Sequence, residues 1–135
     1  MNADYFQVIF KSSDDLTKFP KPFAIVTACN PMDLKLTELE NMKRNEKFKS
    51  ELDGIGCMYG SITGSSPDHS HQEPSYVIKT SVKKALHLGR KFEQRAIFWV
   101  AGKNLQIIDC NTYEKFDLGS FEKRICNSAP ENFSE

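Results

Sequence analysis

A nearly continuous apolar segment, Phe23 to Cys29 (FAIVTAC), constrains the fold more than any other part of the chain. A short run of this kind is typical of a strand that is buried on both faces of a sheet. The run must stop at Asn30-Pro31, because proline lacks an amide donor and asparagine tolerates turn geometry. The sequence therefore predicts a sheet in which this segment is a central strand.

Two helical segments and five further strands are expected around this run. Thr37 and Glu40 have the spacing of a capping box, which predicts a helix over residues 38–53. Ser81 can cap a second helix over residues 82–94. Short runs rich in aromatic and β-branched residues predict strands over residues 5–10, 57–64, 75–80, 96–101 and 105–110.

The predicted order of elements is β-β-α-β-β-α-β-β, and its inner part, β-α-β-β-α-β, is the order of a ferredoxin-like split unit. We therefore predict an α+β fold in which two helices cover one face of a mostly antiparallel sheet. The 135 residues suffice for one domain, which we place at residues 1–126, with residues 127–135 as a flexible tail. Beyond Asn111 the pattern fades, and we expect only side chains that pack across the sheet, namely Tyr113, Phe116, Phe121 and Ile125.

Composition narrows the classes of partner. Lys+Arg and Asp+Glu both number 18, so a net charge of zero removes the whole-protein argument for binding nucleic acid or membrane. No apolar run approaches the roughly 20 residues that cross a bilayer, and the first residues lack the pattern of a signal peptide. Cys29, Cys57 and Cys110 lie in or beside apolar stretches, as free thiols do, and no C-x-x-C pair exists. We expect a cytoplasmic protein without a cofactor.

Several short motifs along the chain form a recognisable pattern. Their residues are Asn30, Pro31, Asn41, Glu73, Pro74, Ser75, Ala85, Leu86, Leu88, Phe92, Gln94, Ala96, Ile97 and Phe98. This pattern resembles that of a family of small bacterial proteins, the domain-of-unknown-function family number 3293. The resemblance covers roughly residues 23–110 and implies a small bacterial cytosolic domain, with no activity attached.

A set of uncharged and acidic polar residues is the first candidate site. Each member lies at the end of an element or on a core-facing stripe, and amide groups suit the recognition of a polar small molecule. The alternative is that these side chains satisfy local backbone groups, as buried amides commonly do. The predicted ligand-binding residues are Asn30, Asn41, Arg44, Glu73, Ser75 and Gln94, with Asn45 on the same helical stripe as Asn41.

The segment His69-Ser70-His71-Gln72-Glu73 is the second candidate. In an extended chain alternate residues share a face, so His71 and Glu73 could act together as an acid/base pair. Two imidazoles and a carboxylate could also ligate Zn²⁺, but no second ligand cluster exists and we predict no metal site. A solvated polar loop is the alternative interpretation.

The second predicted helix carries the third candidate, a basic face. This face could meet an acidic protein or nucleic acid, together with the aromatic hairpin around Phe98 and Trp99, or it could be an ordinary solvated helix surface. Its residues are Lys83, Lys84, Arg90 and Lys91.

The leading hypothesis from the sequence is a domain that binds a polar small molecule, including a nucleotide-like one, with Arg44 or Arg90 available for an anionic group. The first alternative is a macromolecular interaction module that uses the basic helix. The second is a small enzyme with His71 and Glu73 as acid and base.

Overall fold

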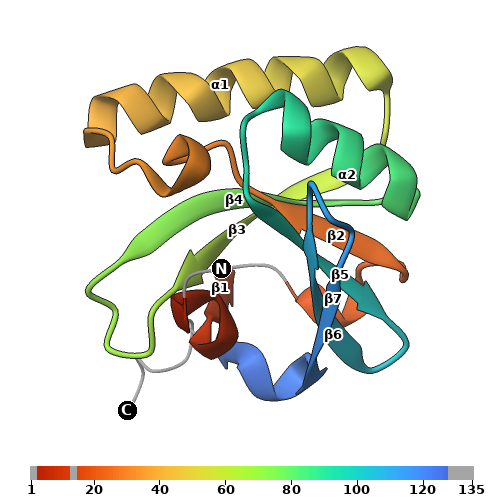
Figure 1. Ribbon diagram of the computed structural model, residues 1–135. Coiled ribbons are helices and arrows are strands. Elements are labelled where there is room, and N and C mark those ends of the chain that lie inside the picture. The colour runs from red at the N-terminus through yellow and green to blue at the C-terminus, as the bar shows by residue number, and fades with distance from the viewer. Residues whose placement is uncertain (1–2, 13–14, 128–135) are drawn as a thin grey trace.

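The computed structural model describes residues 3–12 and 15–127, and within them two helices lie on one face of a mostly antiparallel sheet (Figure 1). The predicted α+β class and the order β-β-α-β-β-α-β-β are therefore confirmed. None of the helices in these two stretches is long and apolar enough to cross a membrane. The elements are η1 (Ala3–Gln7), β1 (Ile9–Ser12), η2 (Leu16–Lys18), β2 (Phe23–Val26), η3 (Pro31–Asp33), α1 (Glu38–Ile55), β3 (Tyr59–Ser65), β4 (Gln72–Ile78), α2 (Val82–Lys91), β5 (Ala96–Ala101), β6 (Asn104–Asp109), β7 (Lys115–Ser120), η4 (Glu122–Arg124) and β8 (Ile125–Asn127).

The sheet has the strand order β7-β6-β5-β2-β4-β3-β1-β8. Its four middle strands, β5-β2-β4-β3, pair antiparallel throughout, which confirms the ferredoxin-like split unit. β2 lies between β4 and β5, and all four of its residues are buried, as the continuous apolar run predicted. The pairing of β1 with β8 is parallel.

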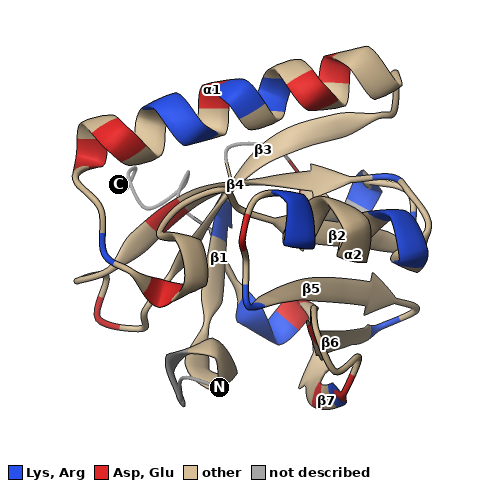
Figure 2. Cartoon of the chain, turned by 45° about the horizontal axis from the view of Figure 1, so that its top comes forward, with Lys and Arg blue, Asp and Glu red and all other residues tan. Residues whose placement is uncertain are grey.

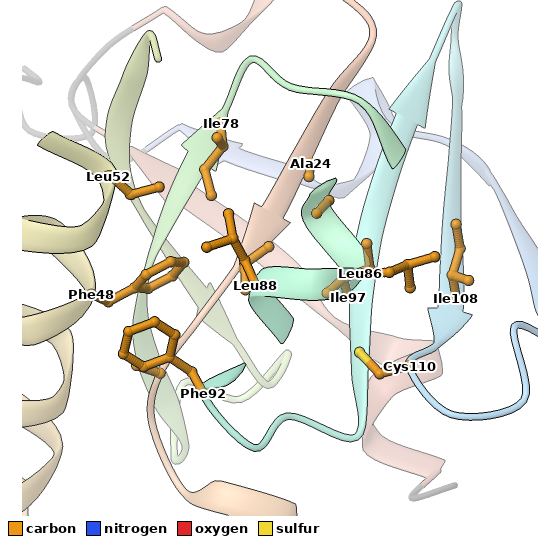
Figure 3. Close-up of a cluster of buried hydrophobic side chains, with 13 residues drawn as sticks. Ala24, Phe48, Leu52, Ile78, Leu86, Leu88, Phe92, Ile97, Ile108 and Cys110 are labelled. Atoms are coloured by element: carbon orange, nitrogen blue, oxygen red, sulfur yellow. The ribbon is translucent and has the colours of Figure 1, made fainter. Parts of the chain in front are cut away.

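Both helices begin at side-chain caps and bury apolar residues against the same face of the sheet. The capping box of Thr37 and Glu40 is present, and the Ser81 hydroxyl accepts a hydrogen bond from the amide of Lys84. Figure 3 shows side chains of α1, α2 and the sheet meeting in one layer. We call this layer the helix-side cluster; its buried members are Ala24, Val26, Ala28, Phe48, Leu52, Ile78, Ala85, Leu86, Leu88, Phe92, Ile97, Ile108 and Cys110.

The opposite face of the sheet is concave and has a cluster of its own. The rings of Phe10 on β1 and Phe98 on β5 lie 5.2 Å apart, although three strands separate β1 from β5 in the sheet. The Arg124 guanidinium donates to the carbonyls of Phe6, Val8 and Leu118 and so links the two ends of the curled sheet. We call this layer the inner cluster; its buried members are Val8, Phe10, Leu16, Phe23, Ile25, Ile62, Val77, Val100, Leu105 and Phe121.

Several element boundaries differ from those predicted. Residues 5–10 are not one strand, because the first part forms η1, from which Phe6 packs edge-on against Phe116, and β1 starts only at Ile9. β4 begins at Gln72, inside the expected loop, and α2 ends at Lys91, three residues early.

β7 and β8 were not predicted. Neither strand has the alternation of apolar residues that would predict it, because β7 alternates only between exposed and half-buried residues and β8 has three residues. Phe121 is buried and Ile125 packs on the inner cluster, as expected, whereas Tyr113 is exposed. The predicted tail begins within β8, and residues 128–135 lie outside the described residues.

Gly89 on α2 tests how closely the helix lies on the sheet. A Cβ at this position would lie 2.7 Å from Cys110 Sγ and 2.9 Å from Ile97 Cγ2, so Gly89→Ala should lower the free energy of unfolding by about 1–2 kcal/mol despite the better helix propensity of alanine. Gly54→Ala on α1 is the matched control, since a Cβ there has no neighbour within 4 Å, and it should stabilise the protein by up to about 1 kcal/mol. Urea denaturation measures both, and equal effects of the two substitutions would contradict this packing.

Candidate functional site

The chain leaves the central strand β2 through an unusual turn. Asn30, Met32 and Asp33 have φ angles of 48°, 49° and 66°, in the left-handed region that non-glycine residues seldom occupy. The amide of Met32 donates to the carbonyl of Glu93 at 2.7 Å, and Glu93 is itself left-handed with φ 60°. Such conformations persist only where surrounding contacts hold them. Residues 27–33 are held by side chains of α1 and by Gln94 after α2.

Asparagines of α1 bind this turn from the helix side. Asn45 accepts from the amide of Ala28 at 3.1 Å and donates to the carbonyl of Pro74 at 2.8 Å. Asn41 and Asn30 bind each other through two hydrogen bonds. The backbone amide of Asn30 donates to Asn41 Oδ1 at 2.8 Å, and Asn41 Nδ2 donates to Asn30 Oδ1 at 2.9 Å. The asparagines thus satisfy local groups, as the structural alternative predicted, and fix the turn to α1 and β4.

Arg44 and Gln94, which were also predicted to bind a ligand, hold the same turn. Arg44 donates to the carbonyls of Ala28 at 2.6 Å and Phe92 at 2.7 Å. The Gln94 amide donates to the carbonyls of Cys29 at 3.0 Å and Phe92 at 3.1 Å, and its side chain is buried. The turn after β2 and the end of α2 are therefore joined by side-chain donors.

A cavity of about 110 Å³ opens at the end of the concave face beside this turn. Its apolar wall consists of inner-cluster residues and their neighbours, and its polar wall comes from the turn, β3, β4 and the end of α2. We call it the barrel-mouth cavity; its lining residues are Tyr5, Val8, Phe10, Ile25, Thr27, Asp33, Gly64, Ser65, Ser66, His71, Glu73, Ser75, Gln94, Ala96 and Phe98.

Only part of the predicted ligand set reaches this cavity. Glu73, Ser75 and Gln94 line it. Asn30 and Asn41 instead line a separate groove between α1 and strands β3 and β4, to which Ser75 also contributes. Asn30 still touches the cavity wall indirectly, because its Nδ2 donates to Glu73 Oε2 at 2.9 Å.

Tyr5, Thr27, Asp33 and Phe98 line the cavity, but they were not among the predicted ligand-binding residues, and Phe98 was expected only in the aromatic hairpin of the interaction surface. Phe98 could have been found from the period of two along β5, since Ala96 and Phe98 both line the cavity while Ile97 faces the helices. No pattern in the sequence around Tyr5 or Asp33 indicated that these residues belong to the site. They meet because the left-handed turn brings Asp33 Oδ1 within 2.8 Å of the Tyr5 hydroxyl, and Arg95 Nε donates to Asp33 Oδ2 at 2.7 Å.

His71 and Glu73 do lie together, as the alternation of residues predicted. His71 Nε2 is 3.2 Å from Glu73 Oε2, and both side chains line the cavity. His69 lies elsewhere: its φ of 64° places it in a turn, where its Nδ1 is 2.9 Å from Lys11 Nζ. Within residues 3–12 and 15–127, no group of three or more His, Cys, Asp and Glu side chains could hold a metal ion.

Burial changes the acidity of two groups near the site. Burial raises the pKa of the Cys29 thiol, which therefore stays protonated and is not an activated nucleophile. The pKa of the Tyr5 hydroxyl is raised as well, mainly by burial and to a smaller extent by the hydrogen bond to Asp33. Cys29 and Cys110 are buried free thiols, which agrees with the structural role expected for them.

Figure 2 shows Lys and Arg residues along α2. Contacts within the chain occupy part of this basic face. Lys91 Nζ is 2.7 Å from Glu51 Oε2 on α1, and Arg90 donates to the carbonyl of Cys110 and the hydroxyl of Tyr113. Lys83 and Lys84 are exposed. Phe98 lines the cavity and Trp99 packs on the helix-side cluster, so the two aromatic residues of the hairpin face opposite sides of the sheet.

Asn45→Ala tests whether the turn depends on the asparagines. The substitution leaves the Ala28 amide and the Pro74 carbonyl without this partner in a buried place, so we expect the free energy of unfolding to fall by about 2 kcal/mol. Asn111→Ala, at an exposed residue, is the control and should change it by less than about 0.5 kcal/mol. Chemical denaturation measures both; a loss at Asn45 no larger than at Asn111 would contradict the role of this side chain.

Comparison with known proteins adds one relationship. The model of the family described as "Protein of unknown function (DUF3293)" matches residues 26–97, just over half of the chain, and confirms the resemblance noted from the motifs. The chain has no significant match among curated proteins or among solved structures. The matched segment runs from the end of β2 to the start of β5 and includes Asn30, Glu73 and Gln94. This chain belongs to the DUF3293 family.

Proposed function

We propose that the protein binds a small polar molecule in the barrel-mouth cavity. The observation that carries this proposal is the composition of its wall, in which a few convergent polar groups surround an apolar floor. Glu73, Ser75 and Gln94 supply polar atoms, and Phe10 and Phe98 supply aromatic surface. Small-molecule sites in proteins commonly combine these two features, and the mouths of curled sheets are a usual place for them.

The rigidity of the polar wall supports the same proposal. Glu73 is held by Asn30, and Gln94 is held by two backbone carbonyls, so neither side chain needs to be ordered when a ligand enters. Preorganised groups of this kind reduce the entropic cost of binding. The asparagine network therefore contributes to binding indirectly, by fixing the groups that line the cavity.

Size and charge set limits on the ligand. A cavity of about 110 Å³ is smaller than the roughly 150 Å³ of one that admits benzene, so a nucleotide-like ligand would insert no more than part of its base. Arg44 and Arg90, the two cations considered for an anionic group, are bound to backbone carbonyls, and neither lines the cavity.

Filling the cavity should abolish binding. In an NMR screen of fragments of mixed charge, we expect hits that shift the amides of Ser75, Ala96 and Phe98, and Ala96→Leu should remove these shifts because its added carbons occupy the space. Ala101→Leu, at an exposed position on the same strand, is the control and should keep them. If no fragment shifts these amides, or if both variants bind equally, the proposal fails.

A second candidate function uses the same cavity. His71 and Glu73 have the geometry of an acid/base pair, and a proton could pass between His71 and a bound molecule. The serine hydroxyls of the cavity donate to other acceptors of the chain, so this candidate activates water or removes a proton and forms no covalent intermediate.

Turnover of model esters and phosphate esters tests the acid/base candidate. We expect the rate to fall by about a hundredfold or more in a folded His71→Gln variant, the usual size of a general acid–base contribution. His87→Gln, at an exposed residue of α2, is the control and should leave the rate unchanged. Turnover that survives in His71→Gln, or no turnover by the native protein, would contradict the candidate.

A further inference from the structure

The polar groups around the barrel-mouth cavity offer a ligand mainly hydrogen-bond acceptors, and Gln94 shows this most clearly. Its Nε2 donates to two backbone carbonyls, at 3.0 and 3.1 Å, which uses both hydrogens of the amide. The side chain is 5% exposed and lines the cavity, and no residue in the described part of the chain donates to its Oε1. Because no buried side-chain oxygen of the described residues lacks a partner, the unpartnered Oε1 of Gln94 retains accessible surface, and a ligand in the cavity can donate to it.

The hydroxyl groups of the wall have also used their hydrogens. Thr27, Ser65 and Ser75 each donate to a nearby backbone carbonyl, at 2.8, 2.8 and 3.0 Å. The Tyr5 hydroxyl donates to Asp33 at 2.8 Å. Since a hydroxyl carries one hydrogen, these four groups can offer only lone pairs to a ligand.

The charged groups of the cavity wall also favour a ligand that donates hydrogen bonds. Asp33 is balanced by Arg95, whose Nε lies 2.7 Å from its Oδ2. Glu73 Oε2 receives Asn30 Nδ2 and lies 3.2 Å from His71 Nε2, while no residue within 3–12 or 15–127 donates to Oε1. Among the described residues, Arg95 is thus the one Lys or Arg side chain paired with these two carboxylates, and Glu73 Oε1 is left for a cationic donor.

The apolar floor suits the uncharged part of a ligand. The rings of Phe10 and Phe98 pack edge to face at 5.2 Å and both line the cavity, so they offer aromatic surface to a ring or an alkyl group. The volume of about 110 Å³ is somewhat below the roughly 150 Å³ of a cavity that admits benzene, so a small ring or branched alkyl group with part of it at the opening suits the space.

We propose, on the basis of the binding function proposed above, that the ligand is a small organic cation. Its ammonium or amidinium N–H groups donate to Gln94 Oε1 and Glu73, and its apolar part lies on the floor formed by Phe10 and Phe98. An anionic ligand would bring further acceptors to a wall that has few donors to offer, and it would leave these groups desolvated and unpaired.

Three probes with the same ring test the proposal: benzylamine, benzyl alcohol and benzoate. Titrated into the ¹⁵N-labelled protein at neutral pH, benzylamine should shift the amides of Ser75, Ala96 and Phe98, with a Kd about tenfold or more below that of benzyl alcohol, because hydrogen bonds to charged groups are the stronger ones. Benzoate should leave these amides unshifted. Cavity binding of benzoate or benzyl alcohol as tight as that of benzylamine would overturn the cation proposal while leaving the binding function intact.

A matched pair of variants identifies the charge that matters. Glu73→Gln keeps an acceptor for Asn30 and should weaken benzylamine binding by about tenfold. Glu122→Gln removes the same charge from an exposed residue of η4 that does not line the cavity, and it should change the Kd by less than about twofold. Equal weakening in both variants overturns the proposal. If neither the three probes nor the wider fragment screen shifts the cavity amides, the proposed function fails as well.

Discussion

The fold and the cavity both depend on side-chain amides that hold the backbone after β2. β2 ends at Val26, earlier than the apolar run to Cys29 predicted, because residues 27–33 turn away from the sheet and Asn30, Met32 and Asp33 take left-handed conformations. Asn41 and Asn45 on α1 and Gln94 after the end of α2 bind the backbone of Asn30, Ala28 and Cys29 in this turn. Because buried backbone groups without partners are costly, the turn has one stable arrangement only when all of them are in place.

The two faces of the sheet are covered in different ways. The helix-side face is closed by α1 and α2, which contribute aromatic and aliphatic side chains to one dense layer (Figure 3). The concave face is closed by curvature, with β1 brought against β5 and the Arg124 guanidinium holding the ends together. The curved sheet does not fill the concave face as the two helices fill the other one. The cavity lies on the concave face, next to the turn after β2, which supplies polar groups.

Much of the fold could be read from local patterns in the sequence. The run at residues 23–29 predicted the central strand, and the capping box of Thr37 and Glu40 predicted the start of α1, because both signals depend on neighbours along the chain. β7 and β8 could not be read, since short edge strands with little burial need no apolar alternation. The cavity was readable only in part. Glu73, Ser75 and Gln94 flank predicted elements, whereas Tyr5 and Asp33 meet only through the left-handed turn and the curl of the sheet.

The extent of the family match has a consequence for the binding function proposed above. Residues 26–97 include Thr27, Glu73 and Gln94, whereas Phe10 and Phe98, the aromatic floor of the cavity, lie outside that segment. On the proposed function, substitutions at these two rings would resize the binding space while the acceptors of the matched segment stay the same. Proteins that share the matched segment would then bind different molecules of one chemical type.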